Sequence, residues 1–316
     1  MKPIVVIADS AAQEQTIEYS ILEPVANVIS APKGDAEKLK ELVKDADALL
    51  TCYTQITEDM VHAMQRCKII ARTGIGVDTV PVKLATEKGI KVTNVPDYCF
   101  NEVADHTLAL MLSLLRGIDA SATASREGYW DLKRAGTLLR ITGRKLGLVG
   151  FGNISRYVAR RAEAFGLQVM VYDPFVQQST LEEYSAKRCE LEELIAQSDV
   201  LSLHVPLNEK TRHLINAKSI SLMKPEAVLV NTSRGGLVDT TALCDALRKG
   251  KIAGAGLDVL EQEPPENIAE IAQTPRLILT SHAAFYSEES MKELRMKSAS
   301  EIALVLAGQQ ARYPVN

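Results

Sequence analysis

Short apolar runs alternate with amphipathic stretches along the first part of the chain. Apolar runs bounded by turn-forming residues are typical of strands, and the stretches between them place apolar residues at helical spacing. The expected strands are 4–8, 25–30, 48–52, 69–71 and 91–93. The expected helices between them include 36–43 and 58–65. This alternation predicts one small parallel α/β sheet.

The stretch 102–116 has apolar residues on nearly every side of the helix that it predicts. A helix with so little polar face must be buried. The next stretch, 121–142, contains the only tryptophan, Trp130, and shows no clear apolar period. Within one chain, these two stretches would form a core helix followed by a surface loop.

A strand, a glycine turn and a helix then follow in the order typical of dinucleotide-binding domains. The apolar run 145–150 leads into Gly150-x-Gly152-x-x-Ser155, after which helical spacing begins. Gly150 permits a tight turn, and Gly152 lets backbone N–H groups approach a pyrophosphate at the positive end of the helix. Ser155 departs from the usual glycine, but because serine is small we expect a slight displacement of the helix and no loss of binding.

The next predicted strand, 167–172, ends at Asp173, which lies 21 positions after Gly152. An acidic residue about 20 positions on is where a ribose 2′-hydroxyl is bound. Asp173 favours NAD over NADP, because a carboxylate repels a 2′-phosphate and residues 174–176 provide no cation. The alternative is that Asp173 only caps the following turn.

Arg234, Glu263 and His282 each follow a short apolar run in the last third of the chain. We expect them where strands of a parallel sheet pass into loops, which is the edge at which such folds bind ligands. A guanidinium, a carboxylate and an imidazole together can anchor an anionic substrate and move one proton. Taken singly, each has a plainer interpretation: a loop arginine is usually solvated, and a lone histidine before two alanines is more often a core residue.

At these residues the chain resembles the D-isomer-specific 2-hydroxyacid dehydrogenases, over nearly its whole length. The glycine turn, the segment 223–239 around Arg234, the Glu-Pro pair at Glu263 and the late His282 recur in that family in this order. The segment 204–216 and the residues after His282 are most similar to the branch of the C-terminal-binding proteins. That branch contains NAD(H)-dependent transcriptional corepressors as well as bacterial dehydrogenases.

The resemblance implies a role for each of these residues. Arg234 would bind the substrate carboxylate and carbonyl, His282 would be the acid/base, and Glu263 would be its carboxylate partner. Asp258 would hold the nicotinamide amide of the NAD cofactor. No metal is expected. The residues expected to contact NAD are Thr107, Gly150, Gly152, Asn153, Ile154, Asp173, His204, Pro206, Thr211, Thr232 and Asp258.

The substrate is expected to contact a glycine-containing loop that follows the predicted strand 69–71. Gly74, Ile75 and Gly76 could present backbone N–H groups to a carboxylate, and Arg72 stands where some relatives place an arginine that faces the substrate. Alternatively, the glycines only shape a turn. Phe285 stands where the corepressor branch carries an active-site tryptophan, so that branch's preference for a thioether-bearing keto acid is not carried over.

The resemblance also implies the architecture. We expect two Rossmann-like or flavodoxin-like parallel-sheet domains, with the NAD-binding domain, 98–284, inserted into a substrate domain formed by 1–97 and 285–316. The final helix, 288–307, would return to the first sheet, and the two crossings would create a hinge and a cleft. The helix and arm within 101–142 would form the two-fold interface of a homodimer.

Composition agrees with a globular enzyme. The chain has 316 residues, 46% hydrophobic and 24% charged, which is ordinary usage for two domains. A net charge of −4 gives no support to nucleic-acid binding through a basic face. The 5 cysteines include no Cys-x-x-Cys pair, which argues against a disulfide framework or a zinc site and suggests a reducing compartment.

No signal peptide or membrane span is visible, and we expect a cytoplasmic location. Residues 1–8 lead directly into a first strand, and the densest apolar run, 108–115, is far shorter than the roughly 20 residues of a membrane span. The chain ends soon after its last predicted helix, so no appended regulatory domain or partner-binding tail is expected.

These observations predict an NAD-dependent D-2-hydroxyacid dehydrogenase, or 2-keto acid reductase, with a small 2-keto or 2-hydroxy acid as substrate. An alternative is an NAD(H)-sensing, corepressor-like scaffold with weak or no turnover, which the intact trio of Arg234, Glu263 and His282 disfavours. A Rossmann methyltransferase fits poorly with segment 231–239 and the late histidine.

Overall fold

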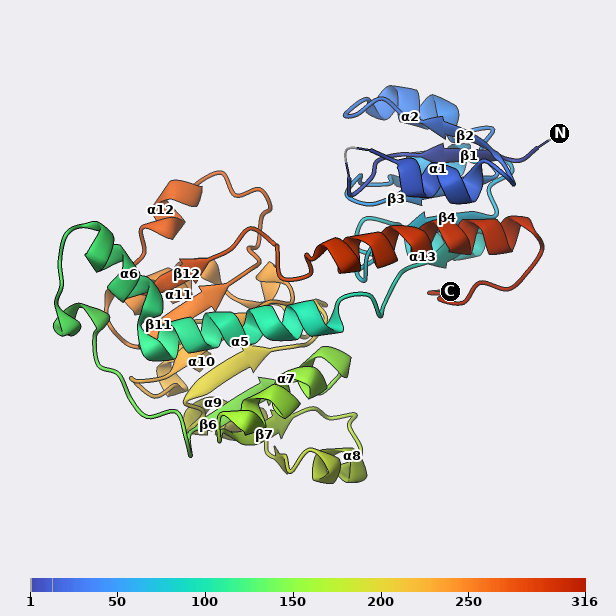
Figure 1. Ribbon diagram of the computed structural model, residues 1–316. Coiled ribbons are helices and arrows are strands. Elements are labelled where there is room, and N and C mark those ends of the chain that lie inside the picture. Colours follow the sequence, from blue (N-terminus) through green and yellow to red (C-terminus); the bar gives the residue numbers. More distant parts are fainter. Residues whose placement is uncertain (1, 13) are drawn as a thin grey trace. The chain divides into compact units, whose positions relative to one another are not determined.

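The computed structural model describes residues 2–12 and 14–316, which divide into two compact units. Unit 1 comprises Met1–Tyr98 and Tyr286–Asn316, and unit 2 comprises Cys99–Phe285 (Figure 1). These limits lie one residue from the domain boundaries expected from the sequence. Among the described residues, no helix is long and apolar enough to cross a membrane.

Unit 1 is built on a parallel sheet with strand order β2-β1-β3-β4-β5. This is the flavodoxin-like order of doubly wound folds. The strands are β1 (Ile4–Ile7), β2 (Asn27–Ser30), β3 (Ala48–Thr51), β4 (Ile69–Arg72) and β5 (Lys91–Thr93). The helices are α1 (Thr16–Leu22), α2 (Ala36–Leu42), α3 (Glu58–Ala63), α4 (Val82–Glu87) and α13 (Glu288–Leu306).

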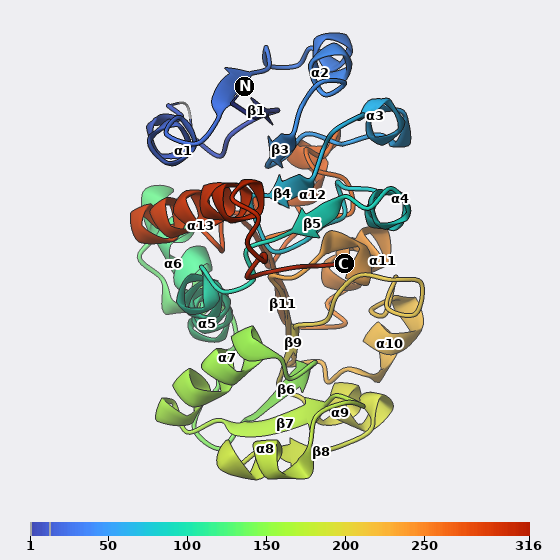
Figure 2. The ribbon, with the colours of Figure 1, turned by 90° about the vertical axis from the view of Figure 1, so that its right-hand side faces the viewer.

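Helices cover both faces of this sheet (Figure 2). Alternate residues of β1 point to opposite faces, so Val6 packs in the core beneath α2–α4 while Val5 packs in the core beneath α1 and α13. The return of the last helix to the first sheet follows from its apolar residues, such as Ile302, which is fully buried against β3 and β4.

A buried ion pair joins α1 to α13. Nε and Nη2 of Arg295 donate to the two carboxylate oxygens of Glu18, at 2.8 and 2.6 Å. The Glu18 side chain is only 1% exposed. Ser10 donates a further hydrogen bond to Glu18 at 3.0 Å, so the buried carboxylate has several partners.

Unit 2 is built on a parallel sheet with strand order β12-β11-β10-β9-β6-β7-β8. Chain order runs outward in both directions from β6, so the switch point between β6 and β9 creates a crevice at the carboxyl ends of the strands, as in Rossmann folds. The predicted fold class is confirmed. The strands are β6 (Lys145–Val149), β7 (Gln168–Tyr172), β8 (Lys187–Arg188), β9 (Val200–Leu203), β10 (Val228–Asn231), β11 (Gly254–Leu257) and β12 (Leu277–Leu279).

Two cores lie on the two faces of the unit 2 sheet, one beneath α5 and α7 and the other beneath α9–α11. The α-helices of this unit are α5 (Phe100–Arg116), α6 (Ile118–Arg126), α7 (Asn153–Ala164), α8 (Gln178–Glu183), α9 (Leu191–Gln197), α10 (Ala217–Leu222), α11 (Thr240–Arg248) and α12 (Ile268–Ala272). Its 3₁₀ helices are η1 (Leu132–Ala135) and η2 (Gly235–Leu237).

Within one chain, helix α5 is buried along one side only, which does not support the alternative of an intramolecular core helix; its further burial in a dimer interface stays a prediction. It packs closely on β11 because Gly254 and Gly256 have no side chains: a Cβ there would lie 2.9 Å from Leu114 and 3.0 Å from Leu110. Ala109 and the last turn of the helix stay at least partly exposed.

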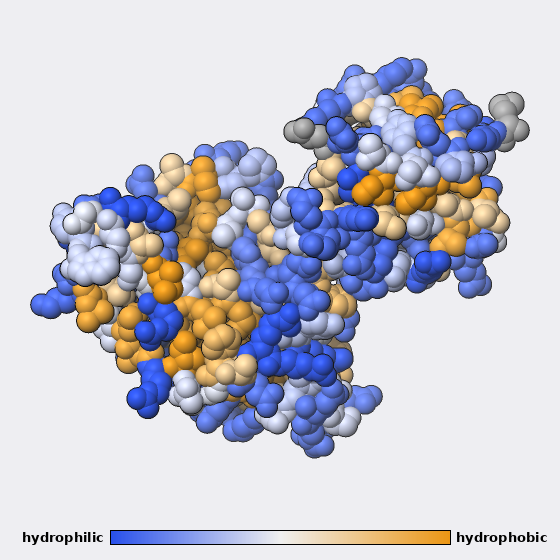
Figure 3. Space-filling view, in the orientation of Figure 1, coloured by the Kyte–Doolittle hydropathy of each residue, from blue (hydrophilic) through white to orange (hydrophobic). Residues whose placement is uncertain are grey.

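The stretch 121–142, which showed no apolar period, contains most of α6 and all of η1. Large apolar side chains there face solvent: Trp130 is 97% and Leu132 83% exposed. The space-filling view shows apolar surface gathered over the region of α5 and α6 (Figure 3). No other part of unit 2 covers this surface. Single exposed apolar residues are common on proteins, but a contiguous apolar patch indicates an interaction site.

Candidate active site

Three neighbouring strands of unit 2 deliver the predicted catalytic residues to one edge of the sheet. Arg234 follows β10, Glu263 lies in the loop after β11, and His282 follows β12. Because β10, β11 and β12 are adjacent and parallel, their carboxyl ends meet at the same edge. This is the edge at which open α/β sheets bind ligands.

His282 and Glu263 form a hydrogen-bonded pair. Nδ1 of His282 lies 2.5 Å from Oε2 of Glu263, and Oε1 of Glu263 accepts the N–H of Leu260 at 2.9 Å. Burial raises the pKa of the Glu263 carboxyl, but the hydrogen bond and charge of His282, the Leu260 N–H and the charge of Arg234 outweigh it and hold the pKa below its usual value. The carboxylate is therefore ionised.

The pair also sets the tautomer of the histidine. An ionised carboxylate only accepts hydrogen bonds, so Nδ1 of His282 must donate to Glu263. Nε2 is then the atom left to exchange a proton with a substrate. The ring also meets Phe285 edge-on, with centroids 6.0 Å apart.

Asp258 holds the backbone that presents His282. His282 has a φ of 53°, a left-handed conformation that few residues other than glycine adopt. Its N–H donates to the carbonyl oxygen of Asp258 at 2.7 Å, and the Asp258 carboxylate accepts the N–H groups of Ala283 and Ala284, both at 2.9 Å. Asp258 therefore supports the histidine, a role that the sequence did not suggest.

The expected contact of Asp258 with the nicotinamide amide remains compatible with this role, because a carboxylate has about four lone-pair sites. The hydroxyl of Thr280 donates to Asp258 at 2.6 Å and lies 3.0 Å from Nε2 of His106. Since Thr280 gives its proton to Asp258, its oxygen accepts from His106. His106 was not among the predicted site residues, because nothing in the sequence links α5 to the end of β12.

Arg234 follows the end of β10, and the backbone after it takes a path that requires glycine at position 235. Nη1 of Arg234 donates to the Ser233 carbonyl oxygen at 2.8 Å, and Asn231 donates to the Arg234 carbonyl oxygen at 2.9 Å. A Cβ at Gly235 would lie 1.9 Å from the carbonyl carbon of Leu260. The segment that carries Arg234 is thus in direct backbone contact with the loop that carries Glu263.

The glycine turn has the shape that a dinucleotide requires. Gly150 has a φ of 88°, and a Cβ there would lie 2.5 Å from the carbonyl oxygen of His204. At Gly152 a Cβ would meet no atom of the described residues within 4 Å, so the backbone at the start of α7 is open to a ligand. Ser155 is fully buried and donates to the Gly152 carbonyl oxygen at 3.2 Å, so this position accommodates serine.

Asp173 does cap the following turn: its Oδ1 accepts the N–H groups of Phe175 at 2.8 Å and Val176 at 3.2 Å. Its Oδ2 accepts the N–H of Phe151, in the glycine turn, at 2.8 Å. The Asp173 carboxylate therefore ties the end of β7 to the glycine turn and still has lone pairs for a further hydrogen bond. Arg188 donates to the Asp173 carbonyl oxygen at 3.0 Å, a nearby cation that residues 174–176 did not reveal.

The other expected cofactor residues lie along the crevice at the ends of β6, β9 and β10. Asn153 and Ile154 open α7, and Thr107 shares a 2.8 Å hydrogen bond with Thr232. Burial lowers the pKa of His204 to about 4, so its ring is neutral. It lies 2.9 Å from the Ser202 hydroxyl.

The remaining two expected cofactor residues, Pro206 and Thr211, lie in the segment after β9. The hydroxyl of Thr211 donates to the carbonyl oxygen of Pro206 at 2.7 Å, which closes that segment on itself.

In unit 1, Arg72 ends β4 and folds over the glycine loop. Gly74 has a φ of 147°, and a Cβ there would lie 1.3 Å from Nη1 of Arg72. Nε of Arg72 is buried and, within residues 2–12 and 14–316, has no hydrogen-bond partner. Asn94 donates to the Ile75 carbonyl oxygen at 2.7 Å, and Gly76 follows in the same loop. The loop therefore carries a partly buried guanidinium that is not fully bonded.

Comparison with known proteins gives a consistent result. The model of the NAD binding domain of D-isomer specific 2-hydroxyacid dehydrogenases matches residues 108–284. The D-3-phosphoglycerate dehydrogenase of Methanocaldococcus jannaschii is 40% identical over 94% of this chain and 56% of its own length. The hydroxypyruvate reductase of Thermotoga maritima is 39% identical over 85% of this chain and 87% of its own length.

Among solved structures, the D-lactate dehydrogenase of Aquifex aeolicus, in complex with NAD and lactic acid, superposes with a TM-score of 0.87. It is 29% identical, and the match covers 96% of each chain. The chain spans about half the length of the phosphoglycerate dehydrogenase, but nearly all of the reductase and the lactate dehydrogenase.

Proposed function

This chain belongs to the family of D-isomer-specific 2-hydroxyacid dehydrogenases, and we propose that it interconverts a small 2-keto acid and the corresponding D-2-hydroxy acid with NAD(H). The observation that carries the proposal is the His282–Glu263 hydrogen bond of 2.5 Å, formed beside Arg234 at the ligand-binding edge of a nucleotide-binding sheet. Reductases and dehydrogenases of such acids among the relatives support turnover over a corepressor-like scaffold.

NAD(H), when bound, supplies or accepts a hydride. The residues of this chain supply orientation and one proton. The planar guanidinium of Arg234 can hold a carboxylate and a carbonyl oxygen together, which an ammonium cannot do. In the direction of reduction, Nε2 of protonated His282 gives its proton to the carbonyl oxygen as negative charge develops there. Glu263 stabilises the imidazolium before that transfer.

The cofactor proposal depends on the fit of the glycine turn. Gly152 leaves the start of α7 open for a pyrophosphate, and the helix contributes positive potential there. Asp173 would accept hydrogen bonds from ribose hydroxyls and repel a 2′-phosphate. The contacts of the other cofactor residues named above are part of the same proposal.

We assign the substrate carboxylate to the loop of Arg72, Gly74, Ile75 and Gly76. The Nε of Arg72, buried without a hydrogen-bond partner among the described residues, supports an anionic ligand near this guanidinium, because a buried N–H group without a partner is costly. Phe285, which meets the His282 ring, would limit the space for the substrate side chain. We therefore propose a small 2-keto acid as the substrate.

We also infer a homodimer in the cytoplasm. The exposed apolar surface over α5, α6 and η1, with Trp130 almost fully exposed, is typical of an interface rather than of a monomer surface. Cys52, Cys67, Cys99, Cys189 and Cys244 are all free thiols, which supports a reducing compartment.

The direct test is NADH oxidation with a panel of small 2-keto acids, including glyoxylate, pyruvate and hydroxypyruvate. The proposal predicts turnover with at least one of them and loss of turnover in His282→Ala. No turnover with any acid, together with tight NADH binding, would instead support an NAD(H)-sensing scaffold.

A further inference from the structure

A second histidine–glutamate pair uses the same loop after β11 that carries Glu263. Nε2 of His213 is 2.5 Å from Oε2 of Glu261, which precedes Glu263 by two positions. Each side chain is partly exposed to solvent. The pair joins the loop after β11 to the segment after β9.

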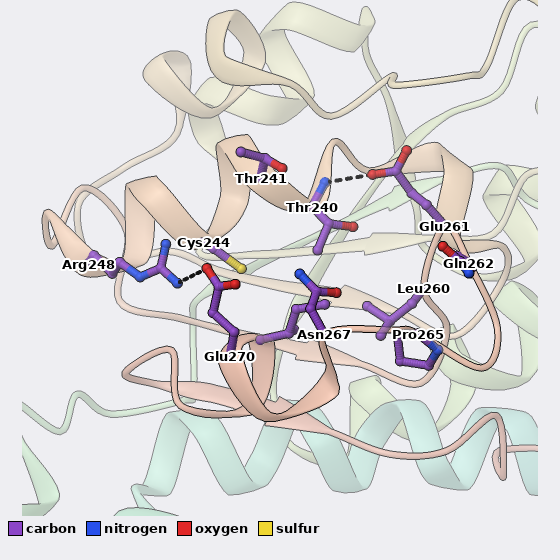
Figure 4. A pocket seen from close by; sticks show the side chains of 11 residues that line it. Thr240, Thr241, Cys244, Arg248, Leu260, Glu261, Gln262, Pro265, Asn267 and Glu270 are labelled. Atoms are coloured by element: carbon purple, nitrogen blue, oxygen red, sulfur yellow. Dashed lines mark hydrogen bonds and ion pairs between the residues drawn. The ribbon is translucent and has the colours of Figure 1, made fainter.

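Glu261 is also bonded through its other oxygen. Oε1 accepts the N–H of Thr240, the first residue of α11, at 3.0 Å (Figure 4). Burial raises the pKa of the Glu261 carboxyl, but the hydrogen bonds from His213 and Thr240 and the charge of His213 outweigh it and lower the pKa. The ionised carboxylate is thus bonded on both oxygens, which fixes the loop at this residue.

His213 is itself held firmly. It has a φ of 49°, in the left-handed region. The N–H of His213 donates to the Gly236 carbonyl oxygen at 2.8 Å, and the side-chain amide of Asn216 donates to the His213 carbonyl oxygen at 2.9 Å. The backbone that carries the imidazole is therefore anchored to Gly236, in the segment that follows Arg234.

Gly235 and Gly236, which directly follow Arg234, contact both the loop after β11 and the segment after β9. A Cβ at Gly235 would lie 1.9 Å from the carbonyl carbon of Leu260, and a Cβ at Gly236 would lie 2.9 Å from the side chain of Leu207. The loop after β11 and the segment after β9 therefore both pack against the backbone next to Arg234. The His213–Glu261 bond connects these two neighbours to each other.

The loop after β11 is buried at its start, through Asp258, Val259 and Leu260, and is mostly exposed beyond Leu260. Residues 258–267, all of which the structure describes, contain no helix or strand. A cavity of about 210 Å³ separates the loop residues Leu260, Glu261 and Pro265 from Thr241 and Arg248 of α11 (Figure 4). On the side of this pocket the exposed part of the loop has open space, so the hydrogen bonds of Glu261 to His213 and Thr240 help to hold it there.

We propose that His213 and Glu261 are positioning residues whose bond, the His213–Glu261 latch, holds the loop so that Glu263 reaches Nδ1 of His282. The latch rests on the proposed function, since it gives the loop a catalytic purpose. Neither residue touches the reacting atoms. The latch acts through Glu263, and its loss should therefore alter how well Glu263 supports protonated His282.

His213→Asn is the variant of choice, because asparagine tolerates the left-handed conformation but is too short to reach Glu261. We expect kcat/KM for keto-acid reduction to fall roughly 3- to 30-fold, the usual size of coupling between contacting residues, with NADH binding unchanged. The alkaline limb of the pH profile should move to lower pH, because a displaced carboxylate stabilises the imidazolium less. His213→Gln, which keeps an amide donor, should recover part of the rate.

Two further variants make the test specific. In a Glu263→Gln background, His213→Asn should cause no additional shift of the alkaline limb. Glu183→Gln removes an exposed ion pair with Arg160, 2.9 Å long, and should change neither the rate nor the limb. An unmoved limb in His213→Asn, or a shift that persists without Glu263, overturns the latch.

Amide hydrogen exchange separates the latch from the proposed function. Peptides that cover residues 258–267 should exchange faster in His213→Asn than in the wild type, whether or not a keto acid is reduced. Unchanged exchange contradicts the latch even if the enzyme is active. Faster exchange in a protein that reduces no keto acid supports the latch and contradicts the proposed function.

Discussion

The two glycines of the glycine turn, Gly150 and Gly152, differ in how much space an added methyl group would have. At Gly152 a Cβ has open space around it among the described residues, whereas at Gly150 it would lie 2.5 Å from the His204 carbonyl oxygen. Gly152→Ala should therefore fold with a melting temperature close to that of the wild type. Its NADH dissociation constant should rise at least about tenfold, or ~1.4 kcal/mol, because the methyl group takes the place of the pyrophosphate.

Fluorescence titration of NADH and a thermal melt check this prediction together. Gly150→Ala is the matched control, since it should lower the melting temperature through its clash and its φ of 88°. Wild-type NADH affinity in Gly152→Ala would mean that the pyrophosphate does not approach this residue.

The second prediction at the residue scale concerns cofactor choice. NADH should bind at least about tenfold more tightly than NADPH, because the Asp173 carboxylate repels a 2′-phosphate. Asp173→Ala should weaken NADH and narrow the gap, and Arg188, already bonded to the carbonyl oxygen of residue 173, remains as a cation for the phosphate. Competitive titration measures both affinities. Equal affinities in the wild type would remove this role from Asp173.

At the scale of elements, the contact of α1 with α13 includes a buried ion pair between Glu18 and Arg295. Removing one partner of such a pair leaves an uncompensated buried charge, so Glu18→Ala should lower the free energy of unfolding by about 3–5 kcal/mol. Urea titration measures this change. Glu183→Ala, which breaks the exposed pair with Arg160, is the control and should cost no more than about 1 kcal/mol. A loss at Glu18 as small as that of the control would contradict the account.

Elements with apolar runs were predictable, and elements without them were not. The buried strands at 48–52 and 69–71 were expected within one or two residues, because strands buried on both faces are continuous apolar runs. Strand β8 has only two residues, Lys187–Arg188, both exposed, and shows no such run. Because β8 was not predicted, Arg188 was not recognised as a cation near Asp173. Helix α6 was missed for a related reason, since its sequence is mostly small and polar residues with a single buried position.

The apolar pattern of α5 predicted that the helix is buried, but such a pattern does not specify which molecule covers it. One side of α5 packs on α7, β10 and β11, while Ala109 stays exposed and Leu115 is only partly buried. An apolar pattern on all sides therefore indicates more burial than unit 2 supplies, which supports a partner over this helix.

At the scale of the whole molecule, the exposed apolar arm predicts a dimer. Trp130 and Leu132 would be covered by a second copy, so the wild type should have twice the chain mass in solution and the double variant Trp130→Ser/Leu132→Ser should shift toward monomer. Sedimentation velocity measures both. Phe175→Ser, which removes an isolated side chain that is 92% exposed, should leave the mass unchanged. A monomeric wild type would contradict the prediction.

The candidate site was predictable as far as chain order and strand ends could define it. The three catalytic candidates, Arg234, Glu263 and His282, could be proposed from the sequence because each follows an apolar run that predicts a strand. The support around them was not found, because Asp258 reaches the residues after His282 only through the register of β11 on β12. His213 likewise meets Glu261 from a distant segment.

The measurement that tests the central claim most directly is kcat/KM for NADH-dependent reduction of the best 2-keto acid, compared between the wild type and His282→Ala. A positioned general acid contributes roughly 10²- to 10⁴-fold, so the variant should lose activity by that factor while its NADH dissociation constant stays near the wild-type value. If His282→Ala reduces the acid at the wild-type rate, the proton does not come from His282 and the account of this site is wrong.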